Sequence, residues 1–257
     1  MRPDPYAFTF EPLFLVLVVV AGGAYAQGAR RERPPVWRVA LFALGLLLVA
    51  APLNSPLETI STHYLLSIHL LQNVMIADWA PPLLVLGLTP GMRLAVARRL
   101  GRPWRRLTRL RVALPAWLLV WYVVHLSFLY DVALRNPWLL NVEHLLLLAA
   151  GTIFWWPVLA RESSGVGTAP ILAYLGIAFI ASSFLGLALT FATTPIYSFY
   201  RDAPRLWGLS AAKDQNLGGI LMTAEQTLVF LGAIVYFLLR LLAEEDESGR
   251  IERPAAR

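Results

Sequence analysis

Cysteine is absent from the 257 residues of this sequence. Disulfide bonds, thiolate metal centres and Cys-x-x-Cys redox chemistry are therefore excluded. Charged residues are also scarce, at 15% of the chain against about 25% in an ordinary soluble domain. Any bound metal ion would need histidine, methionine, carboxylate or amide ligands.

Hydrophobic residues make up 58% of the chain and are gathered in long blocks. A membrane explains such blocks, because a helix of about 20 mainly apolar residues crosses a ~30 Å hydrocarbon core. Lipid offers no partner to free backbone groups, so each block is expected to be helical. The sequence predicts an all-α, polytopic membrane bundle, a single integral domain over residues 1–257 with a tail at 243–257. The seven predicted transmembrane helices cover residues 8–26, 37–53, 64–88, 113–130, 138–160, 170–191 and 217–242.

The Lys and Arg residues are divided unequally between the loops. Of the 22, 17 belong to the first, third and fifth loops or the C-terminal end, and five belong to the other side. Under the positive-inside rule, this division predicts an external N-terminus and a cytoplasmic C-terminus in the cytoplasmic membrane. It also argues against nucleic-acid binding. Interpreting residues 13–26 as a cleaved signal peptide is disfavoured, since cleavage would leave Arg30, Arg31 and Arg33 outside.

Three of the four histidines are predicted to lie at one depth. With a rise of 1.5 Å per residue, His69, His125 and His144 lie about 8–9 Å below the outer ends of their helices. Met222 lies at about 8 Å on the last helix, whereas His63 lies at the outer end of the third. These four residues at a shared depth, His69, His125, His144 and Met222, are the candidate metal ligands.

Other polar residues lie near the same predicted depth as the histidines. Gln72 and Asn73 follow His69 by three and four residues, so they share its helix face. Asp78 lies deeper and is costly in lipid, which predicts a partner such as Glu225, or a backbone group beside Pro81-Pro82. The full supporting polar set is His63, Gln72, Asn73, Asp78, Asp131, Glu143, Asp214, Gln215 and Glu225.

The chemistry of this set leaves three interpretations open. A membrane histidine often only forms a hydrogen bond to a neighbouring helix. Imidazole and thioether together suit Cu(I), whereas two facing imidazoles can ligate haem iron, a weaker alternative here.

The sixth predicted helix carries small residues at four-residue spacing, at Ala178, Ser182 and Gly186. Such spacing lets two helices approach closely in a membrane. It predicts a packing seam rather than a functional site.

Several separate motifs follow one another in order from about residue 35 to 242. The third helix carries His69-x-x-Gln72 and then Ala80-Pro81-Pro82-Leu83-Leu84-Val85-Leu86-Gly87 with Pro90. Further on come His125 with Tyr130-Asp131, Glu143-His144-Leu145, Phe154-Trp155-Trp156-Pro157, Leu206-Trp207-Gly208-Leu209, Asp214-Gln215 and Gly218-Gly219-Ile220-Leu221-Met222. Together these motifs resemble the CtaG family of cytochrome c oxidase assembly factors.

The resemblance implies a multi-helix membrane protein, not an enzyme, that helps to load the copper centre of a haem–copper oxidase. Its implied partners are the lipid bilayer, oxidase subunits and a separate copper donor protein, with copper bound only transiently. The family pattern often has a second histidine four residues after the first, where this chain has Asn73. Asn is a poor copper ligand, which puts direct copper binding in question. The rival function is a copper transporter or a haem-binding membrane redox protein.

Overall fold

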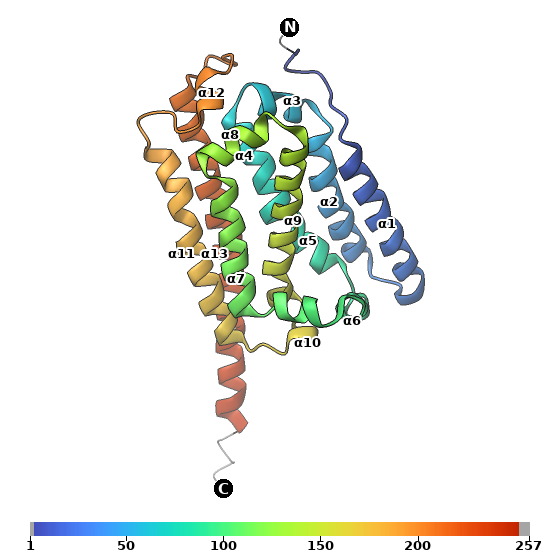
Figure 1. Ribbon diagram of the computed structural model, residues 1–257. Helices are drawn as coiled ribbons and strands as arrows, with labels where there is room; N and C mark the ends of the chain where they lie inside the picture. Colours follow the sequence, from blue (N-terminus) through green and yellow to red (C-terminus); the bar gives the residue numbers. More distant parts are fainter. Residues whose placement is uncertain (1–2, 252–257) are drawn as a thin grey trace.

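A computed structural model describes residues 3–251 of the chain. Within these residues the fold consists of helices and contains no strand. Six helices are long and apolar enough to cross a membrane, and a seventh span results if α6 and α7, bent by 77° at a short break, are counted as one. The predicted all-α bundle with multiple membrane spans is therefore confirmed (Figure 1).

The helices are labelled in chain order. They are α1 (Pro12–Glu32), α2 (Val36–Leu53), α3 (Pro56–His63), α4 (Leu66–Val74), the π-helix η1 (Met75–Trp79), α5 (Ala80–Gly87), α6 (Pro90–Leu107), α7 (Leu110–Val124), α8 (Ser127–Leu134), α9 (Pro137–Leu159), α10 (Arg161–Ser164), α11 (Thr168–Phe191), α12 (Ser198–Asp202) and α13 (Ala211–Ile251).

The short helices mark the two ends of the bundle. Figure 1 shows α3, α8 and α12 at the end where the N-terminus lies, and α6 and α10 at the opposite end, where α13 extends past the bundle. Between them α4, η1 and α5 form a broken central rod that packs against α2, α9 and α13. The predicted polar cluster lies on this rod and its neighbours.

The third predicted span, residues 64–88, is three segments rather than one regular helix. Its π turn, η1, lies directly before Pro81 and Pro82. These prolines have no N–H to donate to the carbonyls of Ala77 and Asp78, so the helical hydrogen-bond pattern is interrupted. Just before them, the Ala80 N–H donates to the carbonyl of Met75, five residues earlier, which is the π-helical pattern. At the same level α9 approaches so closely that any Cβ on Gly151 would collide with the Ala77 carbonyl oxygen.

The fourth predicted span was placed too far along the chain. Residues 113–130 were expected to form one helix, but α7 covers Leu110–Val124 and stops at His125. Leu126 adopts an extended conformation, and α8 starts at Ser127. His125 therefore lies at a helix end, where backbone carbonyls lack an intrahelical partner.

The last helix is longer than predicted. Residues 217–242 were expected, whereas α13 runs from Ala211 to Ile251. Most of the predicted tail at 243–257 is thus helical, and its residues 252–257 lie outside the described part. The Arg240–Glu244 pair, four residues apart with Nε and Oε1 separated by 3.0 Å, supports this extension.

The small-residue seam on α11 is confirmed. Ala178, Ser182 and Gly186 are buried, and α11 makes its most extensive packing contact with α13. Small side chains allow this approach in lipid, where close packing rather than water exclusion drives helix association.

Candidate functional site

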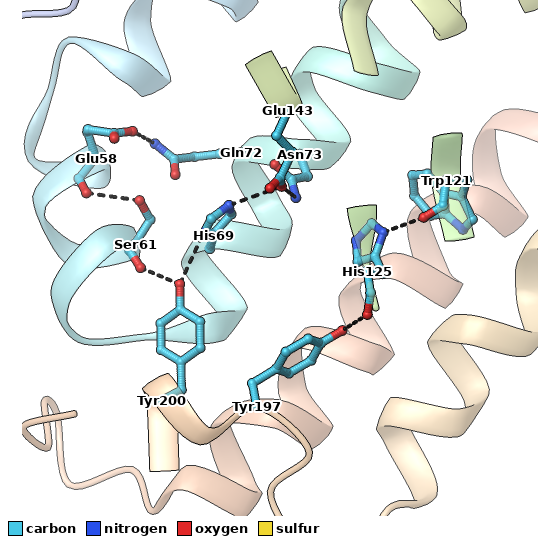
Figure 2. A network of polar contacts seen from close by, with 10 residues as sticks. All are labelled: Glu58, Ser61, His69, Gln72, Asn73, Trp121, His125, Glu143, Tyr197 and Tyr200. Carbon is cyan, nitrogen blue, oxygen red and sulfur yellow. Dashed lines mark hydrogen bonds and ion pairs between the residues drawn. The ribbon is translucent and has the colours of Figure 1, made fainter. Parts of the chain in front are cut away.

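Two of the predicted ligands lie side by side in the half of the bundle that carries α3, α8 and α12. The ring centroids of His69 on α4 and His144 on α9 are 5.9 Å apart. His125 joins them through a tyrosine: the Tyr130 ring lies 4.9 Å from His69 and 5.9 Å from His125. The three imidazoles are all buried. Figure 2 shows His69 and His125 with their polar partners.

Hydrogen bonding fixes which nitrogen of His69 carries the proton. Tyr200 donates its single hydroxyl hydrogen to the Ser61 carbonyl oxygen, at 2.5 Å. His69 Nδ1 lies 2.9 Å from the same hydroxyl, so it must be the donor of that bond. In a neutral ring Nε2 is then unprotonated, and no hydrogen-bond partner from the described residues reaches it.

His125 has the same arrangement for a different reason. The end of α7 frees the Trp121 carbonyl, because the His125 N–H turns to Val123 instead. His125 Nδ1 lies 2.6 Å from that carbonyl oxygen and must donate to it. Its Nε2 is buried and lacks a partner among the described residues. An Nδ1–H held by an oxygen, leaving Nε2 free, is the arrangement common to metal-binding histidines.

His144 has no hydrogen-bond partner for either ring nitrogen among the described residues, although it is buried. An aromatic edge contact with Phe14, with centroids 6.0 Å apart, holds the ring instead. A buried polar group without a partner costs about 1–3 kcal/mol. His69, His125 and His144 each have at least one buried ring nitrogen without a hydrogen-bond partner among the described residues.

Glu143 is the acidic member of the site. Its Oε1 lies 3.7 Å from Nε2 of His69 and accepts a hydrogen bond from the amide of Asn73, at 3.3 Å. Asn73 therefore faces the site. Its Oδ1 has no partner among the described residues.

The predicted thioether lies in apolar surroundings. Met222 is buried on α13 in the hydrophobic cluster that contains Leu70, Val74 and Tyr130. Within the described part of the chain, no three His, Asp or Glu side chains are close enough to form a metal centre. The four-ligand copper site stays a prediction, since the geometry supplies the His69–His144 pair but no complete ligand set.

The polar residues near the end of the bundle with α3, α8 and α12 hold helices together. Asp214 on α13 accepts hydrogen bonds from the backbone N–H groups of Leu66 and Ser67, at 2.7 and 3.1 Å, and so caps α4. Asp131 caps α12 in the same way, through Ser198 and Phe199. Gln215 accepts from Ile196 N–H and donates to the Thr194 carbonyl. Such caps stabilise helix starts by about 0.5–2 kcal/mol.

Gln72 and His63 also have structural partners. Gln72 donates to the Pro52 carbonyl and to Glu58 Oε2, at 2.7 and 2.9 Å. His63, expected at the outer end of the third helix, instead ends the separate helix α3. Its Nδ1 lies 3.2 Å from the Thr59 carbonyl oxygen.

The deeper acidic residues form a pair, as the sequence suggested. Asp78 in η1 interacts with Glu225 of α13. Trp79 donates its indole N–H to Glu225 Oε2 at 2.7 Å. No donor among the remaining described residues reaches the Asp78 oxygens.

Sequence reasoning missed the aromatic residues that orient the imidazoles. Tyr200 orients His69, Trp121 orients His125, and Tyr197 donates to the backbone carbonyl of His125 at 3.0 Å. The only signal was two tyrosines three residues apart, at 197 and 200, in a loop that otherwise looked like a connector.

Comparison with known proteins places the chain in a family. A family model described as cytochrome c oxidase caa3 assembly factor matches residues 20–244. An uncharacterised protein of Mycobacterium leprae is 27% identical over 252 residues, covering 88% of this chain and 38% of its own length. An uncharacterised protein of Mycobacterium bovis is 27% identical over 235 residues, covering 82% of this chain and 35% of its own length.

This chain spans only a little over a third of those relatives. No solved structure matches it. Since the family model covers most of the membrane bundle, including all three imidazoles, the chain belongs to the caa3-type cytochrome c oxidase assembly factor family.

Proposed function

We propose that this protein aids oxidase assembly by carrying Cu(I) at the imidazole site, for delivery to the copper centre of the oxidase. The observation that carries the proposal is the free Nε2 of His69, whose Nδ1–H is bound to an oxygen, beside His144, whose two ring nitrogens have no hydrogen-bond partner among the described residues. Neutral imidazole nitrogens in that state are good ligands for copper.

The position of the site supports delivery from one side of the membrane. His69 lies on α4 shortly after α3, and His125 lies at the end of α7 just before α8. Figure 1 shows that α3 and α8 lie at the same end of the bundle as α12. Under the positive-inside rule that end faces outward from the cytoplasmic membrane, opposite the arginine-rich end. The protein would act there as a chaperone rather than an enzyme, receiving copper from a donor protein and contacting oxidase subunits.

A protein that delivers Cu(I) must also release the ion. The nearby His69–His144 pair and the apolar position of Met222 offer few ligands at once. A two-imidazole site suits Cu(I), which is soft, and leaves it open to capture by a site with more ligands. We therefore expect weak, transient binding of Cu(I).

His69→Gln tests the proposal, because Gln preserves hydrogen bonding but is a poor copper ligand. Protein level in the membrane, Cu(I) bound by the purified protein and oxidase activity are measured together. We expect a normal protein level, Cu(I) binding weaker by at least about tenfold, and reduced oxidase activity. His63→Gln, a histidine outside the imidazole site, is the matched control and should change none of the three.

Normal copper binding and normal oxidase activity in His69→Gln would overturn the proposal. His69→Ala distinguishes a structural role of this histidine from copper ligation. If His69 only supports the fold, the protein level in the membrane should fall in His69→Ala but not in His69→Gln. A Soret band in the visible spectrum of the purified wild-type protein would instead favour the haem-binding alternative.

A further inference from the structure

Two groups of arginines stand out at the α6 end of the bundle. One group has partners: Arg38 donates to the carbonyls of Leu86 and Leu88, and Arg93 pairs with Glu162. The other group, Arg105, Arg109 and Arg111, is exposed, and no carboxylate of the described residues pairs with it. Orientation alone does not explain why these three positive charges gather at one place.

The second group surrounds a cavity of about 530 Å³. The cavity lies where α6 meets α7 at 77°. Gly101 turns the chain ahead of it, with a φ of 66° that favours glycine. Trp104 and Trp156, in edge-to-face contact with centroids 5.0 Å apart, form its aromatic wall.

The lining of this cavity is rich in donors for an anion. The indole N–H of Trp104 is buried and has no acceptor among the described residues. The three guanidinium groups add charged donors, which suit the oxygens of a phosphate. No carboxylate lines the cavity. The lining therefore attracts an anion that is present at this end of the protein.

The remaining walls identify the kind of anion. Leu110, Val166 and the face of Trp156 are apolar. Figure 1 shows α6 lying across the end of the bundle, at the foot of the spans α7 and α9. Arginine with tryptophan at a span end is typical of the membrane–water boundary, where lipid headgroups lie. A free phosphate would use the donors but gain nothing from the apolar walls.

We propose that this cavity binds the phosphate headgroup of an anionic phospholipid, held by Arg105, Arg109, Arg111 and the Trp104 N–H. The lipid would fix the bend between α6 and α7 and anchor α6 to the membrane surface. The proposal does not depend on copper binding at the opposite end.

The test uses the full-length protein in detergent, with lipid retention measured by native mass spectrometry. Phosphatidylglycerol and phosphatidylcholine are added separately, with and without millimolar inorganic phosphate as competitor. The double variant Arg105→Gln/Arg109→Gln is compared with Arg30→Gln/Arg98→Gln, which removes the same charge from exposed positions that do not line the cavity. Trp104→Phe removes only the indole N–H and keeps an aromatic ring.

We expect wild type and the control to retain phosphatidylglycerol in preference to phosphatidylcholine, with no displacement by phosphate. Retention should fall roughly tenfold or more in the double variant, and by less in Trp104→Phe, with unchanged unfolding temperatures. Equal losses in the double variant and the control would mean diffuse charge attraction and would overturn the site. Equal retention of both lipids, or displacement by inorganic phosphate, would also overturn it.

Discussion

Asp214 caps the helix that starts at Leu66, although 148 residues separate the two along the chain. Its two carboxylate oxygens accept from the backbone N–H groups of Leu66 and Ser67, and Oδ1 also accepts from the Ser67 hydroxyl at 2.5 Å. This bond fixes α4 against α13 three residues before His69. Polar contacts at this end of the bundle thereby help to set the position of the His69 imidazole.

Replacing Asp214 by alanine should therefore lower the amount of folded protein. Two backbone donors at the start of α4 would lose their acceptor in a buried place, at a cost of about 1–3 kcal/mol. Membrane protein level and the thermal unfolding midpoint in detergent measure the effect. Asp202→Ala, which removes an exposed carboxylate paired with Arg201 at the same end, should leave both unchanged. An unchanged midpoint in Asp214→Ala would mean that the cap does not stabilise the fold.

Tyr200→Phe should weaken Cu(I) binding while the protein still inserts. Without the hydroxyl, His69 Nδ1–H loses its acceptor, so the proton is no longer held on Nδ1 and Nε2 is no longer kept unprotonated. Loss of such an orienting partner typically lowers metal affinity 10–100-fold. A competition titration with a Cu(I) chelator measures the change. Tyr64→Phe removes a tyrosine hydroxyl bonded to the Pro3 carbonyl, away from the imidazoles, and should bind like wild type. Equal affinity in both variants would exclude this role for Tyr200.

Asn73→His should strengthen Cu(I) binding. The side chain of Asn73 contacts Glu143, whose carboxylate lies near Nε2 of His69. An imidazole there would restore the family spacing and add a ligand to the His69–His144 pair. The same competition titration measures affinity, with Asn216→His on α13, an amide bonded to the Leu189 and Ala192 carbonyls, as the control. Unchanged affinity in Asn73→His would count against copper binding at this place.

Glu58 should make stability depend on pH. Burial in α3 raises the pKa of this carboxyl to about 7, against a smaller lowering by the hydrogen bond from Gln72. Because the folded state holds the proton more tightly, the stabilising contribution is complete below about pH 4.5 and is lost as pH rises through about 7. The loss amounts to at most about 3 kcal/mol.

Unfolding midpoints in detergent at pH 5 and pH 8 test this dependence. Wild type should be less stable at pH 8, and Glu58→Gln should remove most of that difference. In Asp202→Asn the difference should persist, because the pKa of exposed Asp202 is lowered by its hydrogen bond to Arg201. A Glu58→Gln variant that retains the wild-type fall towards pH 8 would contradict the assignment.

The orientation of the bundle can be measured directly. Reporter fusions after Arg33 and after Arg102 should report the cytoplasm, and one after Ala203 should report the outside. The unequal division of Arg and Lys between the loops is the reason. An external signal from the fusion after Arg102 would invert both the orientation and the proposed side of copper delivery.

The amino-acid sequence alone predicted an all-helical membrane bundle and the approximate position of most of its spans, but not the three segments of the third span or the ends of the fourth and last spans. Long apolar blocks and the helical rise are local properties, so they can be counted along the chain. The effect of Pro81-Pro82 on the third span followed from their missing N–H groups. The sequence did not predict the helix break at His125. At this break the His125 side chain, rather than a backbone N–H, donates to the Trp121 carbonyl.

The packing of the whole bundle determines which polar residues lie beside His69 and which hold helices together. The depth of a residue along a helix does not tell in which direction its side chain points. The sequence therefore could not show that His144 lies beside His69 while Met222 lies in an apolar cluster. Asp214 and Gln215 looked like site residues but bind backbone groups far along the chain. Tyr200 looked like part of a connector, yet it specifies the tautomer of His69. These roles depend on contacts between distant segments, which packing of the whole bundle creates.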